Sequence, residues 1–223
     1  MDRVKDELNQ IWKELPEGVR LVAISKYHPK EAIEEAYAAG QRVFGENHVQ
    51  ELMSKESVLP KDIEWHFTGH LQTNKVKYIA PFISLIHSVD SEKLLREINK
   101  QGAKAGRKIP CLIELHVAKE ESKFGFTADE LDQLFGSGIQ DELPYVEIQG
   151  LMAMATNTDD EQRIEEDFAL AYDVFLHLKS TWFKDSPAFK ELSMGMSHDY
   201  HLALRHHTTM VRIGTRIFGE RVY

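Results

Sequence analysis

The sequence lacks features that would assign it to several familiar classes of protein. Cysteine occurs once in 223 residues, as Cys111 within an apolar run, so an internal disulfide is excluded and a small core side chain is expected there. No stretch approaches the roughly 18 consecutive apolar residues of a membrane-spanning helix. Basic residues are outnumbered, with 27 against 36 acidic ones, which argues against nucleic acid or an anionic membrane as the main partner.

The N-terminal segment also lacks the features of a secretory leader. It reads MDRVKDELNQIWKELP, with acidic residues throughout and no apolar central region, so we expect a cytoplasmic protein. Hydrophobic residues make up 42% and charged residues 28% of the chain. This balance is typical of a globular domain and excludes a disordered one.

Short apolar runs alternate with amphipathic segments along the whole chain. Strands are predicted over residues 21–25, 42–44, 64–67, 83–87, 109–117, 146–152, 191–194 and 210–213. Helical patterns separate these runs, and one further helix, with Val4, Leu8 and Ile11 on one face, precedes the first of them. Eight such units in a chain of this length predict a single (β/α)8 TIM-type barrel domain over residues 1–223, with an extra N-terminal helix.

An open, doubly wound parallel sheet is the alternative architecture. Its dinucleotide-binding form requires a G-x-G-x-x-G turn after the first strand. Here the first strand, which ends at Ser25, is followed by Lys26-Tyr27-His28-Pro29, which contains no glycine. The barrel is therefore favoured.

In barrel enzymes the functional groups lie at the carboxyl ends of the strands. Lys26 ends the first apolar strand, so its side chain is expected at the barrel mouth. Loss of hydration there lowers the pKa of a lysine, and the free amine can form a Schiff base with an aldehyde. An ordinary surface lysine is the alternative interpretation.

Small and hydroxyl-bearing residues follow the seventh and eighth predicted strands. Residues 193–197 include Gly195 and Ser197 and precede a predicted helix, and Gly214 and Thr215 follow the last strand. Backbone N–H groups at a helix start, together with a serine hydroxyl, bind anions. The two loops together predict a phosphate site, whereas each alone could be an ordinary turn with a capping serine.

A reactive lysine and a phosphate site suit a carbonyl compound that carries a phosphate group. Pyridoxal 5′-phosphate (PLP) fits, and so does a sugar phosphate acted on by a Schiff-base aldolase. Arg212 ends the eighth strand, where it could meet the ring nitrogen of a pyridine. An arginine only donates, so it would keep that nitrogen unprotonated and make the cofactor a poor electron sink. A salt bridge with a neighbouring carboxylate is the alternative role for Arg212.

Longer motifs around these residues resemble the pyridoxal phosphate homeostasis protein family. The motifs are residues 22–26 with Pro29, 44–47 with Gln50 and Glu51, 65–67 with 69–75, 121–123 with Gly125, 150–152, 192–197 with Asp199, and 212–215 with 217–219. The resemblance extends from Leu21 to Arg221. It implies a barrel similar to the N-terminal domain of alanine racemase, with PLP as the cofactor.

The same resemblance implies roles for individual residues. Lys26 would hold PLP as an internal aldimine, and Arg212 would face the pyridine nitrogen. The phosphate would be bound by Ser197, Gly214 and Thr215.

Two further residues, Asn47 and Met194, would lie beside the ring. Tyr27 and His28 depart from the family pattern, in which threonine and a small or basic residue are frequent, so we expect an altered pocket edge.

The resemblance also implies a role in intracellular PLP homeostasis, in which PLP is stored or delivered to PLP-dependent apoenzymes without robust catalysis. A PLP-dependent amino-acid racemase-like enzyme is the alternative, and a regulatory partner of another protein is a third. Barrel racemases take a second base from an additional domain of a partner subunit. With the last residue at Tyr223, we expect one open face of the cofactor and a monomer.

Histidine is abundant, with 11 residues, but a metal site is not expected. His198 and His201 are three apart and could share a helix face. Neither a cysteine cluster nor a familiar ligand spacing accompanies them, so an exposed polar helix face is the favoured interpretation.

Overall fold

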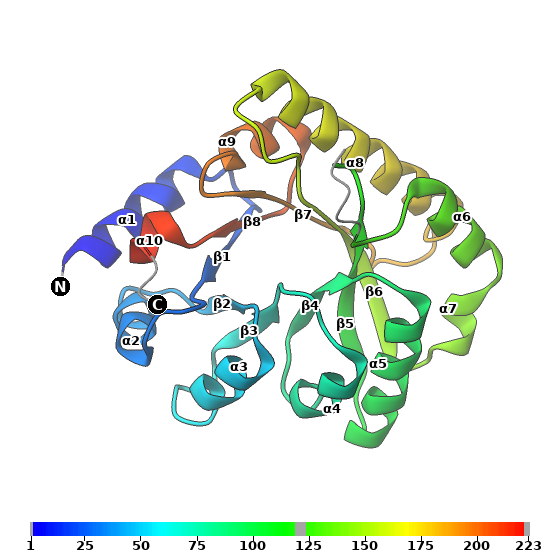
Figure 1. Cartoon of the computed structure of the whole chain (residues 1–223), viewed down its shortest axis with the longest axis horizontal. Coiled ribbons are helices and arrows are strands. Elements are labelled where there is room, and N and C mark those ends of the chain that lie inside the picture. The colour runs from blue at the N-terminus through cyan, green and yellow to red at the C-terminus, as the bar shows by residue number, and fades with distance from the viewer. Residues whose placement is uncertain (1, 119–123, 221–223) are drawn as a thin grey trace.

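The chain folds as a closed barrel in a computed structural model that describes residues 2–118 and 124–220. Within these residues eight parallel strands follow one another around the barrel, and β1 pairs with both β2 and β8 (Figure 1). The strands are β1 Arg20–Ile24, β2 Val43–Glu46, β3 Glu64–Phe67, β4 Leu85–Val89, β5 Ile109–Leu115, β6 Val146–Ala153, β7 Glu191–Met196 and β8 Met210–Ile213.

Helices connect the strands and form the outer ring seen in Figure 1. They are α1 Asp2–Glu14, α2 Lys30–Ala38, α3 Val49–Glu56, α4 Val76–Ile79, α5 Glu92–Ala105, α6 Ala128–Gly136, α7 Ile139–Glu142, α8 Glu161–Thr181, α9 Tyr200–Ala203 and α10 Thr215–Phe218, with 3₁₀ turns at Thr73–Lys75 and Leu204–His206. The predicted (β/α)8 barrel with an N-terminal helix is confirmed.

The strands are largely apolar on both faces because one face lines the barrel and the other packs against helices, although buried polar residues such as His66, His87 and Arg212 interrupt them. The apolar part of the interior is formed by Val22, Leu85, Leu112, Met152 and Met210. Their chain neighbours belong to a larger core between barrel and helices, among them Ala23, Ile86, Cys111, Leu151 and Val211. Cys111 is fully buried there, as its apolar surroundings in the sequence predict.

The largest departure from the prediction concerns the segment around β4. The fourth strand was predicted over 83–87 but spans Leu85–Val89, and the helix expected from Gln72 is a 3₁₀ turn followed by the short α4. The Ile83 N–H donates to the Ile79 carbonyl oxygen at 2.9 Å, so this apolar residue completes the end of α4. The apolar run therefore belongs partly to a helix end and partly to a strand.

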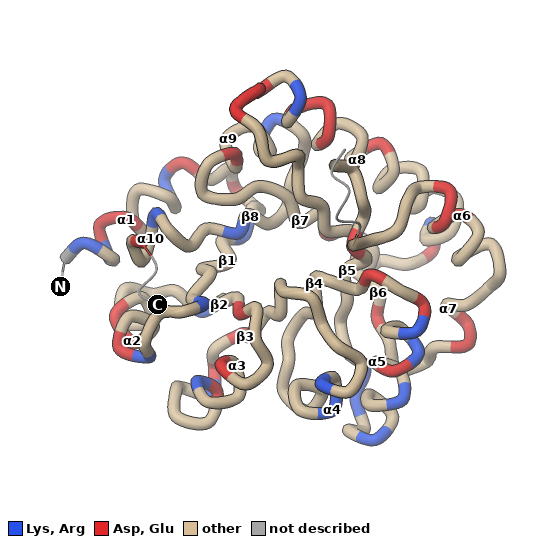
Figure 2. Tube along the Cα trace, in the orientation of Figure 1, with Lys and Arg blue, Asp and Glu red and all other residues tan. Residues whose placement is uncertain are grey.

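Charged residues of both signs lie mostly on the outer ring of helices (Figure 2). The longest helix, α8, illustrates this: it carries acidic residues along its 21-residue length, and Asp160 caps its first turn through the N–H groups of Gln162 and Arg163. None of the helices in the described part of the chain combines the length and apolar character needed to span a lipid bilayer.

Gly150 in β6 provides a test of the packing between neighbouring strands. Its φ is +149°, and a Cβ built there would lie 1.7 Å from the carbonyl oxygen of Glu191 in β7. We predict that Gly150→Ala lowers the free energy of unfolding by about 3 kcal/mol or more, since backbone strain and a clash with backbone add together.

Gly18→Ala is the matched control, because Gly18 also has a positive φ, +88°, but has open space around the added Cβ. It should cost about 1–2 kcal/mol from the left-handed conformation alone. Urea unfolding of both variants measures the difference. Equal losses would show that the contact between β6 and β7 is not the constraint we describe.

Candidate functional site

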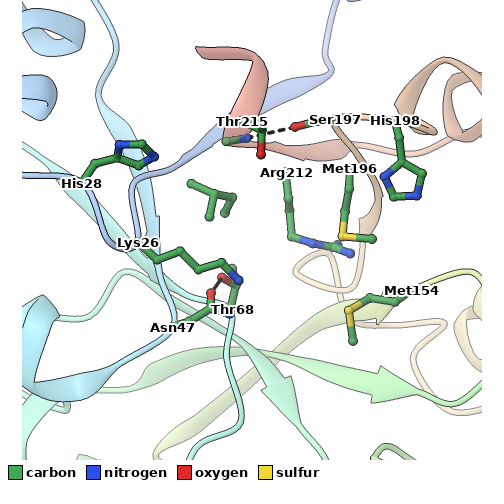
Figure 3. Close-up of a pocket in the computed structure, with 12 residues that line it drawn as sticks. Lys26, His28, Asn47, Thr68, Met154, Met196, Ser197, His198, Arg212 and Thr215 are labelled. Atoms are coloured by element: carbon green, nitrogen blue, oxygen red, sulfur yellow. Dashed lines mark hydrogen bonds between the residues drawn. The ribbon is translucent and has the colours of Figure 1, made fainter. Parts of the chain in front are cut away.

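The carboxyl ends of the strands meet at one rim of the barrel, where a cavity of about 310 Å³ opens. This volume lies at the lower end of the range of roughly 300–1,000 Å³ that is typical of small-molecule sites. Figure 3 shows Lys26 and Arg212 pointing into the cavity, Lys26 from the turn after β1 and Arg212 from β8. The cavity is lined by Ile24, Lys26, His28, Asn47, Thr68, Met154, Met196, Ser197, His198, Arg212, Gly214 and Thr215.

Most of the predicted site residues meet in this one cavity, although they come from opposite ends of the sequence. Those that line it are Lys26, Asn47, Ser197, Arg212, Gly214 and Thr215. The motif at residues 121–123 lies outside the described residues, so its place relative to the cavity is not assigned.

Met194 is the predicted residue that lies elsewhere. Its side chain is fully buried in the core between barrel and helices, and Met196 lines the cavity instead. Successive strand residues face opposite sides, and Ser193 faces the barrel interior, so Met194 faces outward. Gly195 has a φ of +90° and the pairing of β7 with β8 shifts register between Ser193 and Met196, so the alternation is interrupted and Met196 reaches the cavity. The prediction ended the strand at Met194, whereas β7 continues to Met196.

Several lining residues are not predicted from the sequence to bind a ligand in this cavity. They include Thr68, Met196 and His198. Thr68 directly follows the strand Glu64–Phe67, so its position at a strand end was the signal that could have identified it. Its hydroxyl donates to the Asn47 side-chain oxygen at 2.7 Å, and this bond fixes the orientation of the Asn47 amide. His28 lines the cavity edge, where the sequence predicted an unusual residue.

The loops after β7 and β8 are joined beside the end of β1. The Gly214 N–H donates to the Ser197 hydroxyl oxygen at 3.3 Å, and α10 begins at the next residue, Thr215. A Cβ at Gly214 would lie 2.8 Å from the carbonyl oxygen of Ile24. Glycine therefore allows these hydroxyl and amide donors to approach the end of β1, which Lys26 follows.

Arg212 forms a fixed cation at the floor of the cavity. Its Nη1 donates to the Ser193 carbonyl oxygen at 2.8 Å and to the Ser193 hydroxyl at 2.7 Å, and its Nη2 donates to the Ala153 carbonyl oxygen at 3.0 Å. Burial lowers the pKa of Arg212 to about 10, while the negative charges of Asp199 and Glu114 act in the opposite direction. The guanidinium thus stays charged at neutral pH and is held by three bonds.

Polar contacts continue from Arg212 across the barrel interior. The Ser193 hydroxyl lies 3.0 Å from Nδ1 of His87, and Nε2 of His87 lies 2.9 Å from Nδ1 of His66. Burial lowers the pKa of His66 to about 3 and that of His87 well below its usual value. Both imidazole rings are therefore neutral at pH 7. Arg212 carries the one fixed positive charge in this row of hydrogen-bonded side chains.

The described residues contain no group of three histidine, cysteine, aspartate or glutamate side chains that could hold a metal ion. His198, which prompted that question in the sequence, lies 3.4 Å from a carboxylate oxygen of Asp199. Asp199 in turn accepts the Met196 N–H at 2.5 Å, so it shapes the loop after β7. The cavity offers an amine, a buried guanidinium and hydroxyl and amide donors.

Comparison with known proteins identifies relatives of this chain. The family described as "Alanine racemase, N-terminal domain" matches residues 1–222. The pyridoxal phosphate homeostasis protein of Aquifex aeolicus is 40% identical over 205 residues, which cover 92% of this chain and 88% of that protein.

Solved structures agree with this relationship. PipY of Synechococcus elongatus PCC7942, solved without PLP, superposes with a TM-score of 0.91 at 35% identity and covers 97% of this chain and 100% of its own. The same protein with PLP bound gives a TM-score of 0.87 at 34% identity, with the same coverage of both chains. Alanine racemase of Clostridium difficile 630 shares the fold, with a TM-score of 0.76 at 15% identity over 99% of this chain and 56% of its own. The chain belongs to the pyridoxal phosphate homeostasis protein family.

Proposed function

We propose that the chain binds PLP in the rim cavity and stores it or delivers it to PLP-dependent apoenzymes, without robust catalysis. In this proposal the Lys26 amine adds to the aldehyde carbon of PLP, water leaves, and an imine links the two. Ser197, Gly214 and Thr215 bind the phosphate. Arg212 faces the pyridine nitrogen.

The observation that carries the proposal is the meeting of Lys26 with the loops after β7 and β8 in one cavity of about 310 Å³. The donor set suits each part of PLP: an amine for the aldehyde, hydroxyl and amide N–H groups for the phosphate, and a guanidinium for the pyridine. Asn47 lies in the same cavity and is proposed to lie beside the ring. PipY, a relative with the same fold, has been solved with PLP bound.

Arg212 supports a holding role over a catalytic one. Its described bonds to Ser193 and Ala153 use three of the five N–H donors of a guanidinium, so further donors can face a ligand. Because the Arg212 guanidinium keeps its proton, it would leave the pyridine nitrogen of PLP unprotonated. An unprotonated ring withdraws little negative charge from a reacting carbon. The names of the relatives likewise refer to cofactor homeostasis and not to a reaction.

We predict that Lys26→Ala abolishes the visible absorption band of the imine in protein mixed with PLP, because the variant has lost the amine that forms it. Borohydride reduction followed by mass spectrometry should place the adduct on the peptide that contains Lys26. Lys30→Ala is the control, since Lys30 is half-exposed on α2 and does not line the cavity. A full band in Lys26→Ala would refute the assignment of the lysine.

We predict that Ser197→Ala weakens PLP binding about ten- to hundredfold, because a hydrogen bond to a charged group contributes roughly 1.5–3 kcal/mol. Binding of pyridoxal, which lacks the phosphate, should stay unchanged. Equilibrium titrations with both vitamers measure this difference. Ser180→Ala is the control, because this hydroxyl lies on α8 and donates to the His177 carbonyl oxygen. An equal loss for pyridoxal would place the phosphate elsewhere.

Transfer of PLP to an apoenzyme distinguishes a PLP carrier from a PLP-dependent enzyme. PLP-loaded protein should restore activity to the apo form of a PLP-dependent enzyme, and it should not racemise amino acids. Assays of the restored activity and of amino-acid optical rotation test both points. Steady racemisation by the loaded protein would support the racemase-like alternative instead.

A further inference from the structure

A buried ion cluster lies behind the backbone segment that carries Lys26. It consists of Ser25, Glu46 at the end of β2, and Glu51 and Lys55 on α3, and we call it the Lys55 cluster. The Lys55 side chain is only 7% exposed and that of Glu46 is 0% exposed. These four residues are not among the described residues that line the cavity, so ligand binding alone does not explain them.

The three N–H donors of the Lys55 ammonium each meet an acceptor. Nζ lies 2.8 Å from the Ser25 carbonyl oxygen, 2.7 Å from Oε1 of Glu46 and 2.7 Å from Oε1 of Glu51. An ammonium has three donors and no acceptor, so its hydrogen bonding is satisfied by these groups. The ammonium donor makes these bonds charge-assisted and short, and three of them to one group hold the cluster as a rigid unit.

The same two carboxylates bind the residues on either side of Lys26. The Ser25 hydroxyl donates to Oε1 of Glu46 at 2.6 Å. The backbone N–H of Tyr27 donates to Oε1 of Glu51 at 2.7 Å. The cluster thus holds the chain immediately before and immediately after Lys26.

Tyr27 shows that the chain turns sharply at this point. Its φ is +65°, in the left-handed region that a bulky side chain rarely adopts. Such a conformation persists only where the surroundings fix it, and it is found preferentially next to functional groups. The bonds to Glu51 and, through the Tyr27 hydroxyl, to His48 at 2.7 Å supply that constraint.

We propose that the Lys55 cluster is a positioning device that directs the Lys26 amine into the cavity, with Glu51 and Lys55 as its positioning residues. This inference rests on the proposed imine between Lys26 and PLP. A lysine has a flexible four-carbon stem, so the position of its amine depends on how firmly its backbone is held. The cluster acts on imine formation and not on recognition of the phosphate.

The test compares PLP with pyridoxine 5′-phosphate, which has an alcohol in place of the aldehyde and cannot form an imine. Glu51→Ala removes the acceptor for the Tyr27 N–H. We expect this variant to bind PLP about tenfold more weakly or worse, because small displacements of a reacting group have large effects. Its affinity for pyridoxine 5′-phosphate should stay at the wild-type value, and the imine band at saturating PLP should fall.

Three further variants complete the design, and two of them are on α3. Glu51→Gln keeps an oxygen acceptor and should restore both the PLP affinity and the imine band. Glu56→Ala is the matched control, because Glu56 is on α3, pairs with Lys61 at 2.6 Å and has an exposed fraction of 24% against 22% for Glu51. It should leave the binding of both vitamers unchanged. Ser25→Ala deletes only the hydroxyl bonded to Glu46 and should reduce the preference for PLP less than Glu51→Ala does.

The outcomes distinguish this inference from the proposed function. Equal losses for both vitamers in Glu51→Ala and Ser25→Ala, or no recovery in Glu51→Gln, would show that the cluster only stabilises the fold. A preference for PLP that survives in Glu51→Ala would also overturn the positioning role. If the wild type binds both vitamers equally well and shows no imine band, the imine at Lys26 is refuted, and the inference falls with it.

Discussion

Hydrogen bonding between the first and last strands of the barrel holds the site together. Val22 pairs with Arg212 and Ala23 with Ile213, so the residues that follow β1 and β8 lie side by side. The absence of a side chain at Gly214 allows the loop after β8 to lie against Ile24. Closure of the ring brings together groups that are almost a whole chain length apart, and no short sequence motif could join them.

The sequence predicts the barrel and its functional rim because buried parallel strands are continuous apolar runs and their ends are marked by polar residues. It does not predict which residues of a strand face the cavity where the register shifts. The resemblance implies that Met194 lies beside the ring, whereas Met196 lines the cavity, beyond a register shift between β7 and β8. Contacts such as His87 with Ser193, 106 residues apart, depend on the closed barrel and have no local signal.

Burial of a guanidinium inside the barrel is costly, by several kcal/mol per ion even in a relaxed protein. The carbonyl oxygens of Ser193 and Ala153 offset part of this cost, and the neutral His66 and His87 add no second charge. The three hydrogen bonds hold the buried guanidinium in one orientation at the cavity.

Cys111 gives the protein a practical property. Its side chain has no exposed surface, and burial raises the pKa of its thiol far above neutrality, so no reactive thiolate forms. A maleimide dye would therefore not react with the native Cys111 thiol, and it would attach to any cysteine introduced on the barrel rim. Fluorescent labelling beside the cavity needs a single substitution, and the natural cysteine can remain where it is.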